Sequence, residues 1–321
     1  MNKNNVRLAN AFMLFLMGFN MLLVVVLQTW YWEHGQGTYL GDLLMSPLAM
    51  IPLQILMFIV PLQIFMKITG QGSLRASIPF RFRERRLGAT NLVLIFGICF
   101  FLQPAVMLIA GIASMFVTNP ATGVLGQTTS LPFFVGLLIV AVTPAICEEW
   151  IFRGYIQSRY SELPIRKAAF INGVFFGIIH LSLHQFPYAF IMGMVFAYMV
   201  YYTRSFFAGV WAHFLVNGMQ FFLFYVSTLA PEPPPPTTDM DVITAVLIQL
   251  LMVAVVFLPG AIILYNVFVS YNRQRNIKWD LQAVLASPRI RPAEIEKKRP
   301  SPFDSVFWII IMMYAVWMLL L

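Results

Sequence analysis

Long apolar runs alternate with short polar loops along almost the whole chain. Nine such runs have about 17 or more residues, enough to cross a hydrocarbon core of about 30 Å as a helix. They lie at residues 8–30, 45–67, 90–117, 132–150, 166–183, 187–203, 206–228, 241–267 and 305–321. The pattern predicts an all-α fold, a polytopic transmembrane helical bundle with about 8–9 membrane helices.

The composition supports this interpretation. Of the 321 residues, 60% are hydrophobic and only 11% are charged, whereas soluble domains carry about 25% charged residues. The first apolar run lacks a cleavage site of small residues, so it predicts a retained anchor rather than a removed signal peptide. We expect an integral membrane protein of a bacterial plasma membrane, surrounded by the lipid bilayer.

The basic residues indicate how the chain is oriented. The formal net charge is +8, and Lys and Arg concentrate in alternate loops, as the positive-inside rule expects. Residues 67–89 and 268–304 are basic, whereas residues 32–44 and 118–131 contain no Lys or Arg. We therefore expect the N-terminus inside and the C-terminus outside. Anionic lipid headgroups, rather than nucleic acid, are the expected partner of the positive charge.

Two adjacent glutamates, Glu148 and Glu149, stand at the end of an apolar run. Because charge is costly near hydrocarbon, they are candidates for a functional site. On a helix, Glu149 and Arg153 are i,i+4 neighbours and should form an ion pair, which leaves Glu148 to face a cavity as a general base. Pro144 should kink or open this helix. The alternative is that both glutamates are interfacial and pair with Arg153 and Arg159.

Polar side chains in two later apolar runs could complete such a site. His180 lies deep in its run with Phe176 one turn before it, whereas His184 stands near the outer end of that run and suggests an interfacial role. His213 and Asn217 share a helix face, where they could hold a water or stabilise an oxyanion. The alternatives are a packed, hydrogen-bonded His180 and interhelical hydrogen bonds from His213 and Asn217.

These residues form motifs that resemble the signature of a known family. The family is that of the CAAX proteases and bacteriocin-processing proteins (CPBP, also called Abi), which includes the type II CAAX prenyl endopeptidases. The motifs, in chain order, are Glu148-Glu149-xxx-Arg153, Phe176-xxx-His180 and His213-xxx-Asn217. The resemblance covers about residues 130–228 and suggests three parts. These are N-terminal transmembrane segments with a basic cytoplasmic loop at 1–125, a catalytic core at 126–230, and C-terminal transmembrane segments with another basic loop at 231–321.

The resemblance implies an intramembrane endopeptidase that cleaves a membrane-associated peptide or protein. Its substrate would be a prenylated C-terminal tail, a bacteriocin-type leader or a membrane-protein segment, reached through a cavity open to the inside. The resemblance also implies that Glu148 and His180 activate the attacking water, while His213 and Asn217 stabilise the oxyanion. The supporting residues would be Glu149, Arg153 and Phe176.

A metal is the main alternative within this chemistry. Glu148, His180 and His213 could supply a catalytic zinc with three ligands and one open position. However, the chain has no His-Glu-xx-His motif, Asn is a poor zinc ligand, and a carboxylate with an imidazole can activate water alone. We therefore predict a mechanism without a metal cofactor.

Two other functions are compatible with these residues. The same fold could serve as a non-catalytic immunity or scaffold protein. A proton-coupled transporter would also place Glu and His inside a bundle, but no paired, interrupted half-repeats are visible.

Loop counting puts Glu148 near the inner surface and His180 nearer the outer one, about 10 Å apart in depth, so a shared site requires tilted or broken helices.

Overall fold

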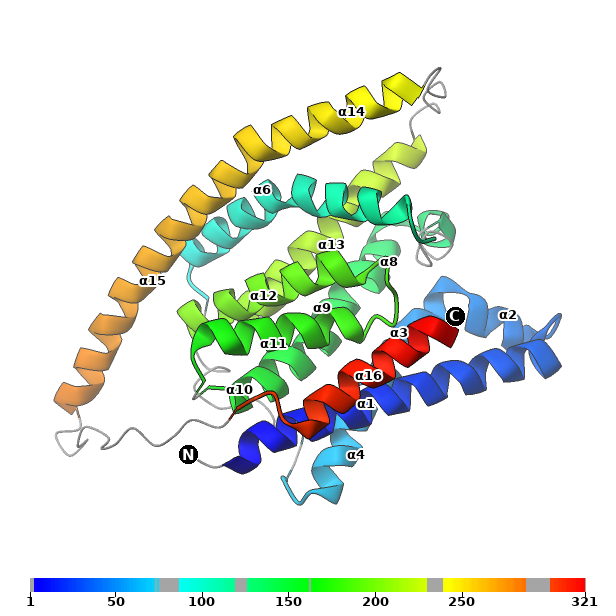
Figure 1. Cartoon of the computed structure of the whole chain (residues 1–321), viewed down its shortest axis with the longest axis horizontal. Coiled ribbons are helices and arrows are strands. Elements are labelled where there is room, and N and C mark those ends of the chain that lie inside the picture. The colour runs from blue at the N-terminus through cyan, green and yellow to red at the C-terminus, as the bar shows by residue number, and fades with distance from the viewer. Residues whose placement is uncertain are drawn as a thin grey trace.

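A computed structural model describes residues 3–72, 74, 87–118, 126–161, 163–229, 239–286 and 301–320. Within these residues the chain folds into helices joined by turns, and no strand occurs (Figure 1). The predicted all-α fold is confirmed. Residues 75–86, 119–125 and 287–300, on which the predicted orientation partly depends, lie outside the described part of the chain.

Seven helical spans in the described residues are long and apolar enough to cross a membrane. They are Asn5–Gly35, Pro47–Ile68, Ala89–Ser114, Phe133–Arg159, Phe186–Thr203, Phe206–Leu229 and Ile243–Ile277. The other two predicted segments form shorter helices, α11 (Ile165–Ile178) and α16 (Ser305–Leu320). The protein is therefore a polytopic helical membrane protein, as the apolar pattern predicts.

Several spans contain more than one kind of helical segment. The first joins α1 (Lys3–Trp30) to a π-helical turn (Tyr31–Gly35), and the short α2 (Tyr39–Met45) follows it. The second joins a 3₁₀ turn (Pro47–Ala49), α3 (Met50–Gln54), a π-helical turn (Ile55–Ile59) and α4 (Val60–Ile68). Nearer the C-terminus, one long helical segment joins α14 (Asp239–Met252), a π-helical turn (Val253–Phe257) and α15 (Leu258–Ala286).

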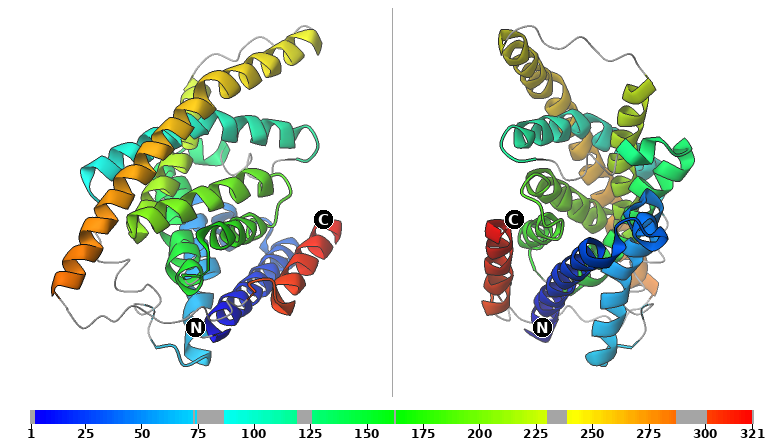
Figure 2. Two further views of the ribbon diagram at one scale, coloured as in Figure 1. Left: turned by 60° about the vertical axis from the view of Figure 1, so that its left-hand side comes forward. Right: turned by 90° about the vertical axis from the view of Figure 1, so that its right-hand side faces the viewer.

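The centre of the bundle consists of four neighbouring segments. These are the rod Phe133–Arg159, α11, α12 (Phe186–Thr203) and α13 (Phe206–Leu229). Helix α6 (Ala89–Ser114) packs against α13, and α15 covers α6 from the outside (Figure 1). Helices α1 and α16 pack together on the opposite side of the bundle, which Figure 2 shows from two further directions. The segments that carry the motifs therefore lie in the middle of the molecule.

The rod Phe133–Arg159 is not a regular α-helix. It consists of α8 (Phe133–Leu137), a π-helical turn (Leu138–Val142), α9 (Thr143–Glu149), a second π-helical turn (Trp150–Ile156) and α10 (Gln157–Arg159). The predicted end of this segment at residue 150 was wrong, because the helix continues to Arg159. Glu148 therefore lies about 15 Å from that end rather than close to it. Much of the predicted difference in depth between Glu148 and His180 disappears.

Helices α11 and α12 approach each other through glycines. A Cβ atom on Gly193 would lie 2.8 Å from Cβ of Phe176 and 2.9 Å from Cα of Gly173. A Cβ atom on Gly173 would lie 2.7 Å from the carbonyl oxygen of Phe190. Small residues are typical where membrane helices pack at short distance. The contact fixes Phe176, and with it the C-terminal end of α11, against α12.

Replacing Gly193 with Ala should destabilise the protein, because the added Cβ must displace Phe176 or the α11 backbone. Overpacking of this kind costs about 1–3 kcal/mol. Gly111→Ala in α6 is the matched control, since nothing lies within 4 Å of its Cβ position. Thermal unfolding in detergent should show a lower midpoint for Gly193→Ala alone, and equal midpoints would contradict the close packing.

Candidate active site

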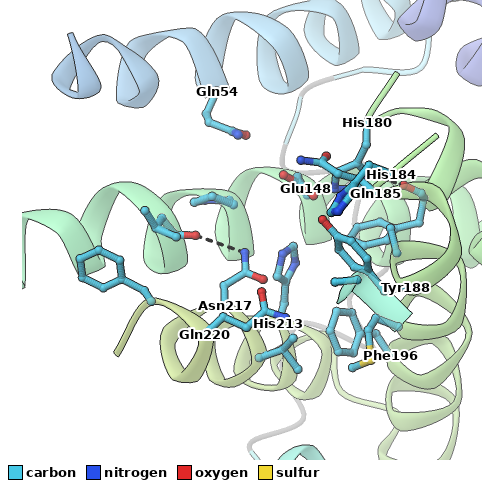
Figure 3. A pocket seen from close by; sticks show the side chains of 18 of the residues that line it. Gln54, Glu148, His180, His184, Gln185, Tyr188, Phe196, His213, Asn217 and Gln220 are labelled. Atoms are coloured by element: carbon cyan, nitrogen blue, oxygen red, sulfur yellow. Dashed lines mark hydrogen bonds between the residues drawn. The ribbon is translucent and has the colours of Figure 1, made fainter. Parts of the chain in front are cut away.

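A cavity of about 540 Å³ lies among the rod, the end of α11, α12, α13 and α3. Its lining includes Glu148, His180, His213 and Asn217, whose side chains Figure 3 shows around it. Phe176 also lines it. The structure thus brings together at one cavity the four side chains that the sequence predicts as catalytic.

Glu149 and Arg153 form a buried ion pair beside this cavity. Nη1 of Arg153 lies 2.6 Å from Oε1 of Glu149, and both side chains are 0% exposed. Arg153 also donates to the carbonyl oxygen of Gly193 at 2.8 Å, and its guanidinium lies 4.7 Å from the centre of the Phe176 ring. Helix α13 leaves room for the carboxylate, because a Cβ atom on Gly209 would lie 2.5 Å from Oε2 of Glu149.

One part of the alternative interpretation, in which the glutamates pair with Arg153 and Arg159, is borne out and the other is not: Glu149 pairs with Arg153, but neither glutamate pairs with Arg159. Glu149 is fully buried. Arg159 donates to the carbonyl oxygen of Tyr155 at 3.0 Å and to the side chain of Gln71, rather than to a glutamate. The i,i+4 spacing predicted the Glu149–Arg153 pair correctly, whereas the presence of a second arginine suggested a partner for Glu148 that the structure does not provide.

The ion pair also fixes the tautomer of His213. Nδ1 of His213 lies 3.0 Å from the same Oε1 atom of Glu149. An ionised carboxylate can only accept hydrogen bonds, and Oε1 of Glu149 accepts one from Arg153 as well. Nδ1 of His213 must therefore carry a hydrogen, which leaves Nε2 as the nitrogen available to a ligand.

His180 is held in the same way by a backbone carbonyl. Its Nδ1 atom lies 2.7 Å from the carbonyl oxygen of Phe176, which can only accept, so Nδ1 carries the hydrogen and Nε2 of the neutral ring has a lone pair. His180 lies in the turn just after α11, not deep within a helix as predicted. The next residue, Leu181, has a φ of 50°, a left-handed conformation that is typical of residues that end a helix.

Glu148 differs from its neighbour in forming no direct ion pair among the described residues. The side chain is 6% exposed and lines the cavity. Its Oε2 atom has no hydrogen-bond partner among the described residues. A carboxylate oxygen without a partner, next to a cavity that also presents an imidazole lone pair, is suited to accept a proton from a water molecule.

Asn217 compensates for the proline in the rod. Pro144 has no N–H, so the carbonyl of Val140, four residues earlier, lacks the usual helical donor. The backbone forms a π-helical turn at this point (Leu138–Val142), and Nδ2 of Asn217 donates to the Val140 oxygen at 3.1 Å. The predicted opening of the helix near Pro144 is thus present. The hydrogen bond is interhelical, as the alternative interpretation of Asn217 expected, and the same side chain lines the cavity.

The comparison with protein families agrees with this geometry. Residues 130–219 match the family model described as type II CAAX prenyl endopeptidase Rce1-like. This segment, called the Rce1-like domain below, is similar to that family. It contains all the motif residues and is consistent with the CPBP membrane peptidases, so the resemblance drawn from the motifs is confirmed. Comparison with curated proteins gives no match, and comparison with solved structures gives none either.

The match places the Rce1-like domain beside a general class of proteins. Proteins of this family are in general intramembrane proteases of the CAAX type, and the apolar helices make this protein an integral membrane protein. The matched segment covers less than a third of the chain, from α8 to the middle of α13. The flanking helices are outside the match.

The cavity extends from the middle of the Rce1-like domain toward the end that is away from the basic residues. Along the rod its lining runs from Ile139 to Glu148, whereas arginines stand nearer the C-terminal end of the rod and directly after α12. Along α6, which follows the basic residues 81–86, the lining residues belong to the second half.

Sequence reasoning missed several residues of the cavity. His184, predicted to be interfacial, is 1% exposed and lines the cavity together with Gln54, Gln185 and Tyr188. The only sequence signal was the spacing of four residues between His180 and His184. This spacing would suggest one helix face, but α11 ends at Ile178 and the two histidines lie in a turn.

The cavity has one feature that is typical of a metal site. Both His180 and His213 donate from Nδ1 to an oxygen acceptor, an arrangement that is usual for zinc-binding histidines. However, no group of three His, Cys, Asp or Glu side chains in the described residues lies close enough together to hold a metal ion. Binding of zinc by Glu148, His180 and His213 would therefore require these side chains to move together.

Replacing Glu149 with Gln should strongly destabilise the Rce1-like domain, because Arg153 would remain buried without a counter-charge. Breaking a buried ion pair in this way costs about 3–5 kcal/mol. Glu148→Gln is the matched control, since the same chemical change at the adjacent residue breaks no ion pair among the described residues. Unfolding in detergent should separate the two variants, and similar losses of stability would contradict the different roles of the two glutamates.

Proposed function

We propose that this protein is an intramembrane endopeptidase that hydrolyses a peptide bond of a membrane-associated substrate with a water activated by Glu148 and His180. The observation that supports it best is that an unpaired buried carboxylate and the imidazoles of His180 and His213 line one cavity within an Rce1-like domain. In this proposal the protein's own side chains suffice for the reaction, and no metal takes part.

The attack begins with a water placed between Oε2 of Glu148 and Nε2 of His180. Glu148 accepts one proton from this water, and the hydroxide adds to the carbonyl carbon of the substrate. Collapse of the tetrahedral intermediate breaks the C–N bond, while the proton passes from Glu148 to the leaving amine. The oxygen of the water ends in the new carboxyl group, and each catalytic side chain returns to its starting protonation state.

The oxyanion of the intermediate would be stabilised from α13. Asn217 uses one amide hydrogen for Val140 and has a second hydrogen for the oxyanion. His213 donates from Nε2 only as an imidazolium, because its Nδ1 hydrogen is directed at Glu149. The Glu149 carboxylate lies 3.0 Å from Nδ1 and fixes the ring. Glu149 and Arg153 would thus act on the reaction through the orientation of His213.

The position of the cavity bears on the substrate. If the basic residues face the cytoplasm, the cavity extends from the middle of the membrane, at Glu148, into its outer half, where Ile139 and Val140 line it. A leader peptide or a membrane-protein segment exposed on the outer side would reach it more directly than a prenylated cytoplasmic tail. We therefore favour these two substrate classes for this protein.

Glu148→Gln should abolish proteolysis by the reconstituted, full-length protein. Removal of a general base lowers the rate by about 10²–10⁴-fold. The assay offers leader-like peptides, single-span peptides and S-farnesylated peptides to the protein in lipid nanodiscs, with cleavage detected by mass spectrometry. His34→Phe, which changes an exposed histidine, is the control and should cleave normally. Full activity of Glu148→Gln, or failure of the wild type to cleave any peptide, would contradict the proposal and favour a scaffold or transport role.

Metal chelation should leave the activity unchanged. With 1,10-phenanthroline or EDTA present, we expect kcat/KM of the wild type to stay within about two-fold of its initial value, because no ligand set of the zinc-peptidase kind takes part. Loss of activity that is restored by added Zn²⁺ would instead support zinc binding by Glu148, His180 and His213.

A further inference from the structure

A third histidine, His184, lines the cavity without taking part in the proposed chemistry. It lies in the turn between α11 and α12 and is only 1% exposed. Its Nε2 atom lies 2.8 Å from Oγ of Ser114, the last residue of α6. The interaction holds the imidazole against a helix from outside the Rce1-like domain.

Ser114 determines which nitrogen of His184 carries the hydrogen. The Ser114 hydroxyl donates its one hydrogen to the carbonyl oxygen of Ala110 at 3.0 Å. With the hydroxyl hydrogen assigned to Ala110, Oγ of Ser114 accepts the hydrogen on Nε2 of His184, and on this assignment Nδ1 of the neutral ring has a lone pair. This Nδ1 atom is buried and has no hydrogen-bond partner among the described residues.

Gln54 provides a second unused acceptor at the same cavity. It extends from α3 toward the cavity on the side away from α13 (Figure 3). Its Oε1 atom is buried and likewise has no partner among the described residues. Buried polar atoms in native proteins nearly always have a hydrogen-bond partner. These two acceptors lie at the cavity, where a ligand that brings hydrogen-bond donors can reach both of them.

We propose that His184 and Gln54 form a substrate-binding subsite that accepts hydrogen bonds from backbone N–H groups of the peptide substrate. This inference rests on the proposed peptidase function and adds residues that bind the substrate. A peptide chain carries one N–H group at each residue other than proline, so it supplies donors at regular intervals along the cavity. Glu148 and His180 remain free to hold the water, because the subsite uses neither of them.

The subsite can be tested by binding without cleavage. Full-length protein with Glu148→Gln in nanodiscs is titrated with fluorescent leader-like, single-span and S-farnesylated peptides, each unmodified or N-methylated at one backbone position. N-methylation removes a single N–H donor. At the position that meets His184, it should weaken binding by about 10-fold, measured by fluorescence anisotropy.

The same comparison in a His184→Phe background isolates the histidine. Because Phe cannot accept a hydrogen bond, the N-methylated and unmodified peptides should bind this variant equally. His184→Asn, whose side-chain oxygen can take the place of Nδ1, should restore part of the difference. His34→Phe is the exposed control and should behave like the parent protein. If His184→Phe does not fold, Gln54→Leu provides the same comparison at a second peptide position.

The outcomes separate this inference from the proposed function. An equal effect of N-methylation in the parent and in His184→Phe would overturn the subsite, even if the wild type cleaves peptides. If the parent prefers unmodified to N-methylated peptides and His184→Phe does not, while the wild type cleaves no peptide, the subsite is supported and the peptidase function is refuted. Failure of the parent to bind any of the peptides would overturn both.

Discussion

The buried ion pair between Glu149 and Arg153 is the interaction on which the functional part of the molecule depends. Both charges are removed from water, which is tolerable only where further hydrogen bonds satisfy them. These come from the Gly193 carbonyl on α12 and from His213 on α13. Three segments therefore meet at one ion pair, and the orientation of a candidate catalytic imidazole is inseparable from the packing of the bundle.

A second polar connection lies on the other side of Glu148. A proline inside a membrane helix frees a carbonyl that lipid cannot satisfy, and Asn217 supplies the missing donor to Val140. The rod is thus joined to α13 on both sides of the candidate base. Rigid support of this kind is what a site needs when it must hold a water at a fixed position in an apolar environment.

The sequence was most informative where interacting residues lie on one helix or belong to one motif. The Glu149–Arg153 pair follows from helical spacing, and the long apolar spans follow from their length. The π-helical turns left no signal in the apolar pattern, and the arginines at 153 and 159 resembled a membrane boundary although the helix continues through them. His184 and Gln54 could not be assigned, because their positions depend on contacts with Ser114 and with a cavity built from segments far apart in the chain.

The irregular rod has an evolutionary consequence. A π-helical turn arises when one extra residue is accommodated in an α-helix, and one residue corresponds to a rotation of about 100° around the axis. The π-helical turn absorbs that rotation, because its residues turn the chain by less than those of an α-helix. A homologue lacking one residue within Leu138–Val142 would therefore form a regular helix there with α8 in nearly the same orientation, so an alignment that forbids single-residue gaps would underestimate how many relatives share this site.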